Sequence, residues 1–365
     1  MSTRFYCRFA ITAAMLGFAL ATGMALAHGP AAAGDRISET RRLMGVPWTI
    51  SIYAADQPTG GRAITAAFAE ILRLERVLSN YEPASELSRL SARAAEPEPT
   101  TVSDDLWQVL VQAEEFRRRS DGAFDVSVGP LTTLWRQSRR SGRLPRTDKL
   151  AVARAAVGPG AVEFHADRQA VRLPKAGSRL DPGGIGMGYA ADRALAVLES
   201  HGIHAALIDA SGDVAVSGPP PGTTGWRIEV APLEPGGESE TLVLTHAAVT
   251  TSGDAYQAVE IGGNRYSHIV DPRTGIGVAG PAAVTVIAAD ATTADVLATA
   301  ASVLGPEAAP AVIAKYPGTS ARFVWRTADD VRTSTTGPWP GRIIHGAGRR
   351  QRSQSSSPPR SVPPR

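Results

Sequence analysis

The stretch Thr251-Ser252-Gly253-Asp254, with the later run Tyr266-Ser267-His268-Ile269-Val270-Asp271-Pro272-Arg273-Thr274-Gly275, contains the most informative pattern in the chain. Between them, residues 255–261 and 265–270 alternate apolar and polar side chains around Gly262-Gly263-Asn264. Alternation on both sides of a glycine-rich turn is typical of a β-hairpin. The sequence therefore predicts a hairpin whose outer ends carry polar turns.

Strand pleating predicts a common face for three side chains of this hairpin. Successive side chains of a strand point to opposite faces, so Tyr266, His268 and Val270 are expected together. The polar turns then bring Asp254 and Asp271 close to His268, on loops of the kind that often hold functional residues. Each group also has a structural interpretation. A single strand histidine is often structural, and Asp254 could bond its own backbone in an Asx turn, act as a base or support another group.

Composition and charge limit the classes of function. The chain has 365 residues, of which 43% are hydrophobic and 6% aromatic, enough for a sizeable core in one large domain or two. The sequence pI is about 9.2, but seven arginines lie at the two ends of the chain, at positions 4 and 8 and within residues 346–365. Without these seven, the formal charge of +3 becomes −4 for residues 10–345. A nucleic-acid surface is therefore not expected in the folded part.

The N-terminus has the pattern of a secretory signal peptide over residues 1–27. Two arginines precede an apolar run at 11–20, and Ala25-Leu26-Ala27 provides small residues for cleavage. The run is short for a membrane span, although an uncleaved anchor is the alternative. Cleavage after Ala27 would also remove Cys7, the only cysteine. We therefore expect an exported chain without a transmembrane span, thiol or disulfide.

The rest of the chain is expected to be one domain of the α+β class. We expect residues 28–40 to form a short lead, residues 41–345 a single large catalytic domain, and the Ser-, Pro- and Arg-rich residues 346–365 a disordered tail. Hydrophobic periodicity predicts helices at 64–78, 106–119, 189–199 and 292–304, and strands at 204–210 and 226–230. Helices and strands are mixed, with βαβ alternation only once, so an α+β fold is favoured over a doubly wound sheet.

The glycine-rich run Gly186-Met187-Gly188-Tyr189-Ala190-Ala191 allows three interpretations. It satisfies G-x-G-x-x-A, and Asp209 ends the next expected strand, as in a dinucleotide-binding oxidoreductase of the Rossmann type. However, residues 178–182 contain no apolar strand to precede the turn. The glycines could instead allow close packing. The interpretation we favour is that the loop and helix start bind a dinucleotide's phosphates through backbone N–H groups.

Asp295 and Thr299 are four residues apart in an expected helix, so both project from one face. A carboxylate and a hydroxyl at this spacing suit a hard divalent cation, which prefers oxygen ligands. The structural alternative is that Thr292 and Asp295 form a helix cap and that Thr299 bonds back to its own helix.

Several motifs, taken together and in order, resemble the FAD:protein FMN transferases, the ApbE family. The hairpin resembles the family's T-S-G-D-Y and H-H-I-L-D-P-R-T-G signatures. Further blocks that match in order are Met44-Gly45, Ser79-Asn80-Tyr81-Glu82-Pro83, Gly122-Ala123-Phe124-Asp125, Leu180-Asp181 with Gly183-Gly184-Ile185-Gly186, and Ala294-Asp295 with Thr299. The resemblance covers roughly residues 44–325, which makes chance an unsatisfactory explanation.

The resemblance implies a cleft that binds FAD and Mg²⁺. The residues that it places against FAD are Met44, Tyr81, Ala123, Phe124, Asp125, Asp181, Met187 and Val270. It places Mg²⁺ on Asp295, Thr299 and an oxygen of Gly184 or Gly186. His268 or Asp254 is then the base. The family usually has G-G-I-A-K-G, so Gly186-Met187 replaces Ala-Lys and a cation near the phosphates is lost.

The activity implied by the resemblance is transfer of FMN from FAD to a threonine hydroxyl of an acceptor redox protein, with release of AMP. Two alternatives use the same site: a hydrolase that gives free FMN and AMP, and a flavin-binding protein without catalysis. Many relatives are lipoproteins attached through a cysteine at the cleavage point, which this chain lacks. We therefore expect a soluble, exported and periplasmic protein that is not a lipoprotein.

Overall fold

The computed structural model describes residues 34–230, 240–253, 258–279, 282–327 and 330–340, with the backbone of 342–343. The expected signal peptide, residues 28–33 of the expected lead, Asp254 and the expected tail lie outside the described residues. Residues 35–40 of that lead are described and form part of the first strand of the main sheet.

The described chain contains helices and strands in mixed order. The helices are α1 (Gln57–Leu78), α2 (Glu86–Ala92), α3 (Asp104–Arg119), α4 (Gly129–Ser141), α5 (Thr147–Ala155), α6 (Gly186–Ser200) and α7 (Ala291–Ile313), with the 3₁₀ turn η1 (Ala166–Arg168). The strands are β1 (Asp35–Leu43), β2 (Val46–Ala54), β3 (Thr100–Thr101), β4 (Glu163–His165), β5 (Ala170–Arg172), β6 (Ala205–Ala210), β7 (Asp213–Val216), β8 (Trp226–Val230), β9 (Glu240–Leu244), β10 (Ala247–Gly253), β11 (Ala258–Ile261), β12 (Asn264–Val270), β13 (Gly277–Ala279), β14 (Ala282–Ala288), β15 (Ser320–Arg326), β16 (Val331–Thr336) and β17 (Arg342–Ile343).

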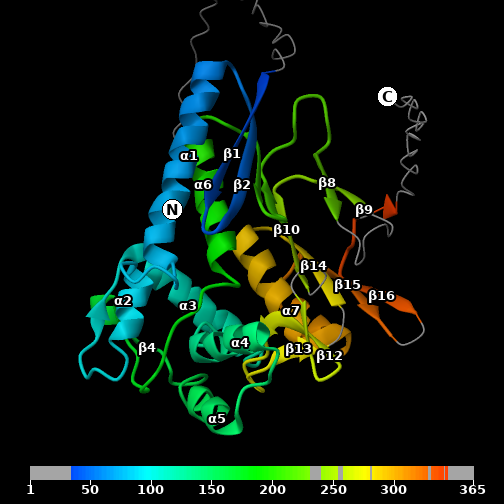
Figure 1. Cartoon of the computed structure of the whole chain (residues 1–365). Coiled ribbons are helices and arrows are strands. Elements are labelled where there is room, and N and C mark those ends of the chain that lie inside the picture. The colour runs from blue at the N-terminus through cyan, green and yellow to red at the C-terminus, as the bar shows by residue number, and fades with distance from the viewer. Residues whose placement is uncertain are drawn as a thin grey trace, which may run out of the picture. The chain divides into compact units, whose positions relative to one another are not determined.

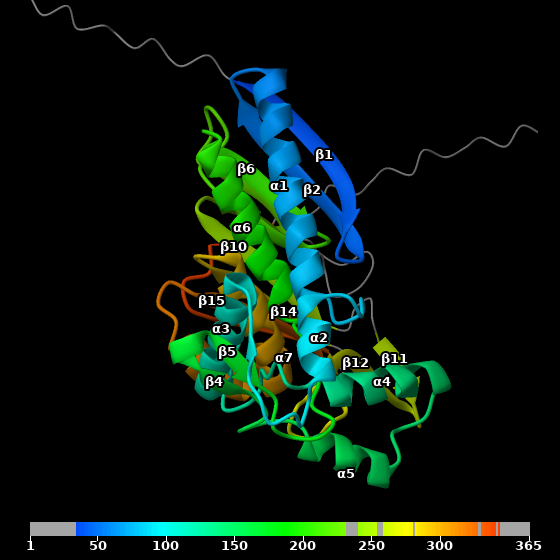
Figure 2. The same cartoon turned by 90° about the vertical axis from the view of Figure 1, so that its left-hand side faces the viewer.

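The main sheet is antiparallel throughout its described pairings, in the order β1-β2-β6-β7-β10-β14-β15-β16. Helices α1, α6 and α7 pack against one face, with α1 beside α6 (Figures 1 and 2). The small sheet β17-β9-β8 contributes to a second apolar cluster that includes Val214 and Val216 of β7. The α+β prediction is confirmed. The Rossmann alternative is wrong, because its phosphate loop would need parallel strands around it.

Helix α1 shows how local signals and packing combine. The Asp56 carboxylate caps the helix by accepting from the Thr59 N–H at 2.7 Å. Its apolar positions face the core, and Phe68 and Ile71 are fully buried. The sequence predicted the C-terminal end of α1 but not its first two turns, which contain glycine. A Cβ at Gly60 would lie 2.2 Å from Ile37 Cδ1 of β1, so a larger residue there would require the Ile37 side chain to shift.

Helix α7 begins at a different cap from the one considered as an alternative above. Asp290 is the N-cap and accepts from the Thr293 N–H at 2.7 Å, so a cap formed by Thr292 and Asp295 is wrong. Among the described helices, α7 alone is long and apolar enough to match a membrane span. It packs on α6 and on the sheet, and burial in the core accounts for its composition.

The predicted hairpin is confirmed in its described part. β11 and β12 pair antiparallel around Gly262 and Gly263, which have φ of +60° and +79°, and β13 completes a small sheet. Positive φ at both central turn positions explains the two glycines. Trp135 of α4 packs under this sheet and donates its Nε1–H to the Ser267 carbonyl at 2.9 Å. A side chain at Gly277 would lie 2.4 Å from the Trp135 ring, so glycine permits the contact.

Candidate functional site

Asp181 connects the glycine-rich loop to helix α4. Its Oδ1 accepts from the Gly183 N–H at 3.0 Å, which holds the loop. Its Oδ2 accepts from the Thr132 hydroxyl at 2.6 Å and from Arg136 Nη2 at 3.0 Å. The residue is only 7% exposed. Asp181 therefore fixes the loop and α4 relative to each other.

The loop meets α7 at the predicted metal ligands. A Cβ on Gly184 would lie 2.7 Å from Thr299 Oγ1, so the loop backbone and that hydroxyl are adjacent. Asp295 Oδ2 accepts from the Gly188 N–H at 3.2 Å. Gly186 begins α6, between these two contacts. The structure thus brings Gly184 next to Thr299 and Asp295 next to the first turn of α6, which Gly186 begins.

Gly188 also confirms the close-packing interpretation. A Cβ there would lie 2.3 Å from the backbone oxygen of Ala291, at the crossing of α6 and α7. Gly186 has more space, because the nearest atom to a Cβ there is 3.6 Å away, on Pro182. The two glycines therefore differ, and only Gly188 is required by sterics.

Three aspartates influence one another around this point, and we call Asp192, Asp213 and Asp295 the carboxylate cluster. Burial raises the pKa of Asp295 well above its usual value, and the charges of Asp213 and Asp192 raise it further. Burial likewise raises the pKa of Asp213 to about 7. Burial also raises the pKa of Asp192, although that carboxylate accepts from the Ala291 N–H at 2.8 Å and from the Thr292 hydroxyl at 2.6 Å.

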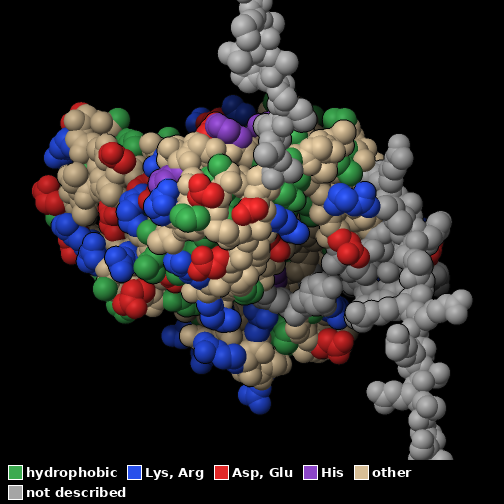
Figure 3. All heavy atoms as spheres, turned by 90° about the horizontal axis from the view of Figure 1, so that it is seen from above, with side chains coloured by type: hydrophobic (Ala, Val, Ile, Leu, Met, Phe, Trp, Pro, Cys, Tyr) green, Lys and Arg blue, Asp and Glu red, His purple; other side chains and the backbone are tan. Residues whose placement is uncertain are grey.

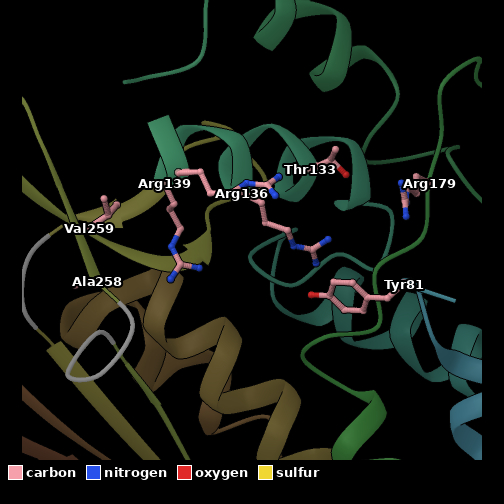
Figure 4. Close-up of a pocket in the computed structure, with 8 residues that line it drawn as sticks. Tyr81, Thr133, Arg136, Arg139, Arg179, Ala258 and Val259 are labelled. Carbon is pink, nitrogen blue, oxygen red and sulfur yellow. The ribbon is translucent and has the colours of Figure 1, made fainter. Parts of the chain in front are cut away.

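A second feature lies on the other side of Asp181, and we call it the arginine pocket. It is a cavity of about 610 Å³ lined by Tyr81, Thr133, Arg136, Arg139, Arg140, Arg179, Ala258 and Val259. In Figure 4, Arg136 and Arg139 extend from α4 toward the cavity, and Tyr81 lies below Arg136. The Arg136 guanidinium is 4.7 Å from the centre of the Tyr81 ring, and Tyr81 is 74% exposed. Arg179 donates to the Asn80 carbonyl at 2.7 Å.

The block Ala123-Phe124-Asp125 lies next to Asp181, because the Asp181 N–H donates to the Val126 carbonyl at 2.8 Å. All three side chains are buried, so the backbone is what this block could offer a ligand. Asp125 Oδ1 accepts from the Ser127 N–H and hydroxyl at 2.8 and 2.6 Å. Burial raises the pKa of Asp125, against the lowering effect of these bonds.

The same block meets the D-P-R-T-G turn. Asp125 and Gly122 line a smaller cavity of about 280 Å³ together with Pro272 and Arg273. Asp271 is engaged within this turn, since both of its carboxylate oxygens accept from Arg273 at 2.9 Å. The role of Asp271 is therefore to brace the turn.

The remaining predicted FAD residues lie on several elements. Met44 has φ +48° in the β1–β2 turn, and its N–H donates to Glu75 Oε1 at 3.0 Å. Met187 packs partly against the main core in the first turn of α6 and brings no charge there. Val270 is buried with Leu131.

His268 lies on β12, one residue after the Ser267 that Trp135 holds. Tyr266 and Val270 pack in the same apolar cluster, as the predicted common face requires. The β12–β13 register shifts between these two residues, so the direction of His268 stays a prediction. Its assignment as a base also stays a prediction, as does that of Asp254, which lies outside the described residues.

Sequence reasoning missed two groups. Asp213 follows a Ser-Gly pair just as Asp254 does, and this repeated Ser-Gly-Asp was an available signal. Arg136, Arg139 and Arg140 have helical spacing on α4, which indicates a basic helix face. No helix had been predicted for that segment, and the signal was therefore not used.

Charged side chains of both signs lie on the surface of the described part. On the face shown in Figure 3, basic and acidic side chains are interspersed.

Comparisons with known proteins identify the class. Residues 44–323 match the model of the ApbE family, and the chain belongs to that family. A FAD:protein FMN transferase of Treponema pallidum (strain Nichols) is 31% identical over 289 residues, which cover 72% of this chain and 77% of that protein. One from Klebsiella pneumoniae (strain 342) is 29% identical over 297 residues, covering 80% and 90%. The crystal structure of Pseudomonas stutzeri flavinyl transferase ApbE, in its apo form, has a TM-score of 0.73 and 28% identity, covering 83% and 95%.

Proposed function

We propose that this protein is a FAD:protein FMN transferase that uses Mg²⁺, modifies a threonine of an acceptor redox protein and releases AMP. It is an enzyme of the flavinyltransferase class, as its family membership indicates. The observation that carries the proposal is the meeting of Gly184 with Thr299 and of Gly188 with Asp295. These contacts assemble one site from segments more than a hundred residues apart.

The residues at this meeting point fit a hard divalent cation. Asp295 offers a buried carboxylate, Thr299 a hydroxyl and the Gly184–Gly186 loop its carbonyl oxygens, which are all ligands that Mg²⁺ accepts. The described residues contain no group of three His, Cys, Asp or Glu suited to a metal. A cation here would therefore share its coordination with substrate oxygens, as Mg²⁺ commonly does with phosphates. When bound, it would offset negative charge on the diphosphate.

The protein's own groups would then position the two reactants. The threonine oxygen forms a bond to the phosphorus of the FMN half, and the bond from that phosphorus to the bridging oxygen breaks, so AMP leaves with that oxygen. The proton of the hydroxyl passes to His268 or Asp254. Trp135 holds the strand that carries His268, and Asp181 holds the glycine-rich loop that would face the diphosphate. Both contacts preorganise the site before the substrates arrive.

One experiment separates this activity from its two alternatives. Purified protein is incubated with FAD and Mg²⁺, with and without an acceptor domain that presents a threonine, and AMP and protein-bound FMN are measured. A transferase releases AMP in step with FMN appearing on the acceptor. AMP and free FMN without an acceptor indicate a hydrolase, and no AMP in either arm indicates a binding protein. Adding EDTA should stop release, and undiminished release would contradict the Mg²⁺ dependence.

We also propose that the enzyme is exported and works in the periplasm as a soluble protein. The support is the charged start, apolar run and Ala25-Leu26-Ala27 of the sequence. Intact-mass analysis of protein from the envelope fraction should give a chain that begins at His28. A chain that retains Met1, or one with a lipid attached, would contradict this.

A further inference from the structure

The arginine pocket has an unusual balance of charge. Four guanidinium groups line it, and no acidic side chain does so among the described residues. Within that part of the chain, Arg136 pairs with Asp181, whereas Arg139 and Arg140 have no carboxylate partner. Like charges around one cavity repel each other, and an anion that enters it is stabilised by all of them.

The pocket is built into the fold and is not a chance gathering of surface side chains. Arg136, Arg139 and Arg140 are spaced by three or four residues on α4, so they share one side of the helix. The adjacent side of α4 is held in the core by the buried Leu131 and Trp135. Arg179 approaches the cavity from another segment (Figure 4).

The surroundings favour a nucleotide over an acidic protein segment. Tyr81 presents an exposed ring beneath Arg136, which suits stacking of a flat base or flavin ring. Arg136 also contacts Asp181, the residue that holds the glycine-rich loop. The volume of the cavity falls within the range of small-molecule sites.

We infer that the arginine pocket binds the diphosphate of FAD, with Arg139 and Arg140 as affinity-determining residues. The inference rests on the proposed function and names the groups that recognise its substrate. Guanidinium groups bind phosphate oxygens through paired, charge-assisted hydrogen bonds. The first turn of α6 has Met187 and supplies no cation, so these arginines provide the positive side-chain charge for the diphosphate.

The test measures equilibrium binding in EDTA, without turnover or acceptor, using FAD and riboflavin as probes. Arg139→Ala and Arg140→Ala should each weaken FAD binding by roughly tenfold, as expected for one partly exposed charge-assisted contact. Riboflavin, which has no phosphate, should bind equally to all variants. Arg139→Lys should lose less than Arg139→Ala. Arg143→Ala is the matched control, because Arg143 is exposed just beyond α4 and does not line the pocket.

Three results would overturn the inference, and they distinguish failure of the pocket assignment from failure of the proposed function. If Arg139→Ala and Arg140→Ala bind FAD as Arg143→Ala does, the pocket does not hold the diphosphate, while the proposed function stands. If these two variants bind FAD normally but transfer FMN more slowly, the pocket serves the acceptor protein. If the wild-type chain binds no FAD with or without Mg²⁺, the proposed function fails as well.

Discussion

The carboxylate cluster and the arginine pocket differ in the sign of their charge and in their exposure to water. The carboxylate cluster lies in a tightly packed region where α6 and α7 cross at Gly188, and burial together with mutual repulsion raises the pKa values there. The arginine pocket is open, and its guanidinium groups remain in contact with water. A buried carboxylate needs a nearby positive charge in order to ionise. An exposed arginine stays charged in water whether or not an anion is bound. A buried negative cluster beside an exposed positive pocket would suit a diphosphate that binds together with a cation.

The largest expected effect comes from the carboxylate cluster. Asp295→Ala should lower FMN transfer by roughly 10³-fold or more, since loss of a cation that stabilises phosphoryl charge costs several kcal/mol in the transition state. Transfer is followed at a range of Mg²⁺ concentrations. The control is Asp290→Ala, which removes the α7 cap and should cost only about 0.5–2 kcal/mol of unfolding free energy. Equal turnover in both variants would remove the cation site from this region.

The next effect concerns the hairpin beside the arginine pocket. His268→Ala should leave FAD binding intact and slow FMN transfer by roughly 10²–10⁴-fold, the usual contribution of a positioned acid–base group. The wild-type rate should rise through neutral pH, where imidazole loses its proton. Single-turnover assays from about pH 5 to 9 measure both. His201→Ala at the end of α6 is the control. An unchanged rate and pH profile would leave Asp254 as the candidate base.

A steric contrast follows within the glycine-rich run. Gly188→Ala should lower the unfolding free energy by about 1–3 kcal/mol, because its Cβ would collide with a backbone oxygen. Gly186→Ala should be tolerated or slightly stabilising, since its Cβ has room and helical glycine costs about 0.5–1 kcal/mol relative to alanine. Chemical denaturation of both variants compares them. Similar losses would show that the crossing of α6 and α7 is less tight than described.

A loss of stability of similar size is expected from Trp135→Phe. The change removes the donor to the Ser267 carbonyl and should cost about 1–3 kcal/mol. Because the hydrogen bond holds the strand of His268, transfer should fall more than FAD affinity. Thermal unfolding measures the loss of stability, and separate assays measure the FMN transfer rate and the FAD affinity. Trp107→Phe is the control. A proportionate loss of binding and transfer would indicate a purely structural contact.

The smallest effect concerns Asp125, a buried carboxylate whose Oδ1 is bonded to Ser127. Its raised pKa means that the folded chain keeps this proton to higher pH than the unfolded chain does. The contribution of Asp125 to the unfolding free energy therefore falls as pH rises from about 3.8 through the folded pKa. Asp125→Asn should show less of this decline in urea titrations at several pH values. An identical decline would assign it to other groups, such as the carboxylate cluster.

The sequence by itself determined the elements whose signals are local. The hairpin around Gly262-Gly263, the helix at 106–119 within α3 and the strand Trp226–Val230 follow from turn chemistry, helical periodicity and alternation. Motif order identified the family, and helical spacing placed Asp295 and Thr299 on one face of a helix. These features depend on residues close together along the chain, so periodicity and side-chain chemistry are sufficient to predict them.

Tertiary structure decided what depends on contacts between distant segments. Only the crossing of α6 and α7 distinguishes the required Gly188 from the permissive Gly186. Only packing places Asp213 near Asp295 and aligns the α4 arginines with Tyr81. The start of α1 was not predicted either, because two glycines weaken its local helix signal, and only the fold shows Gly60 packed against Ile37 of β1. Contacts between distant segments, and the electrostatic effects of those contacts, depend on how the whole chain folds. A local sequence pattern does not contain that information.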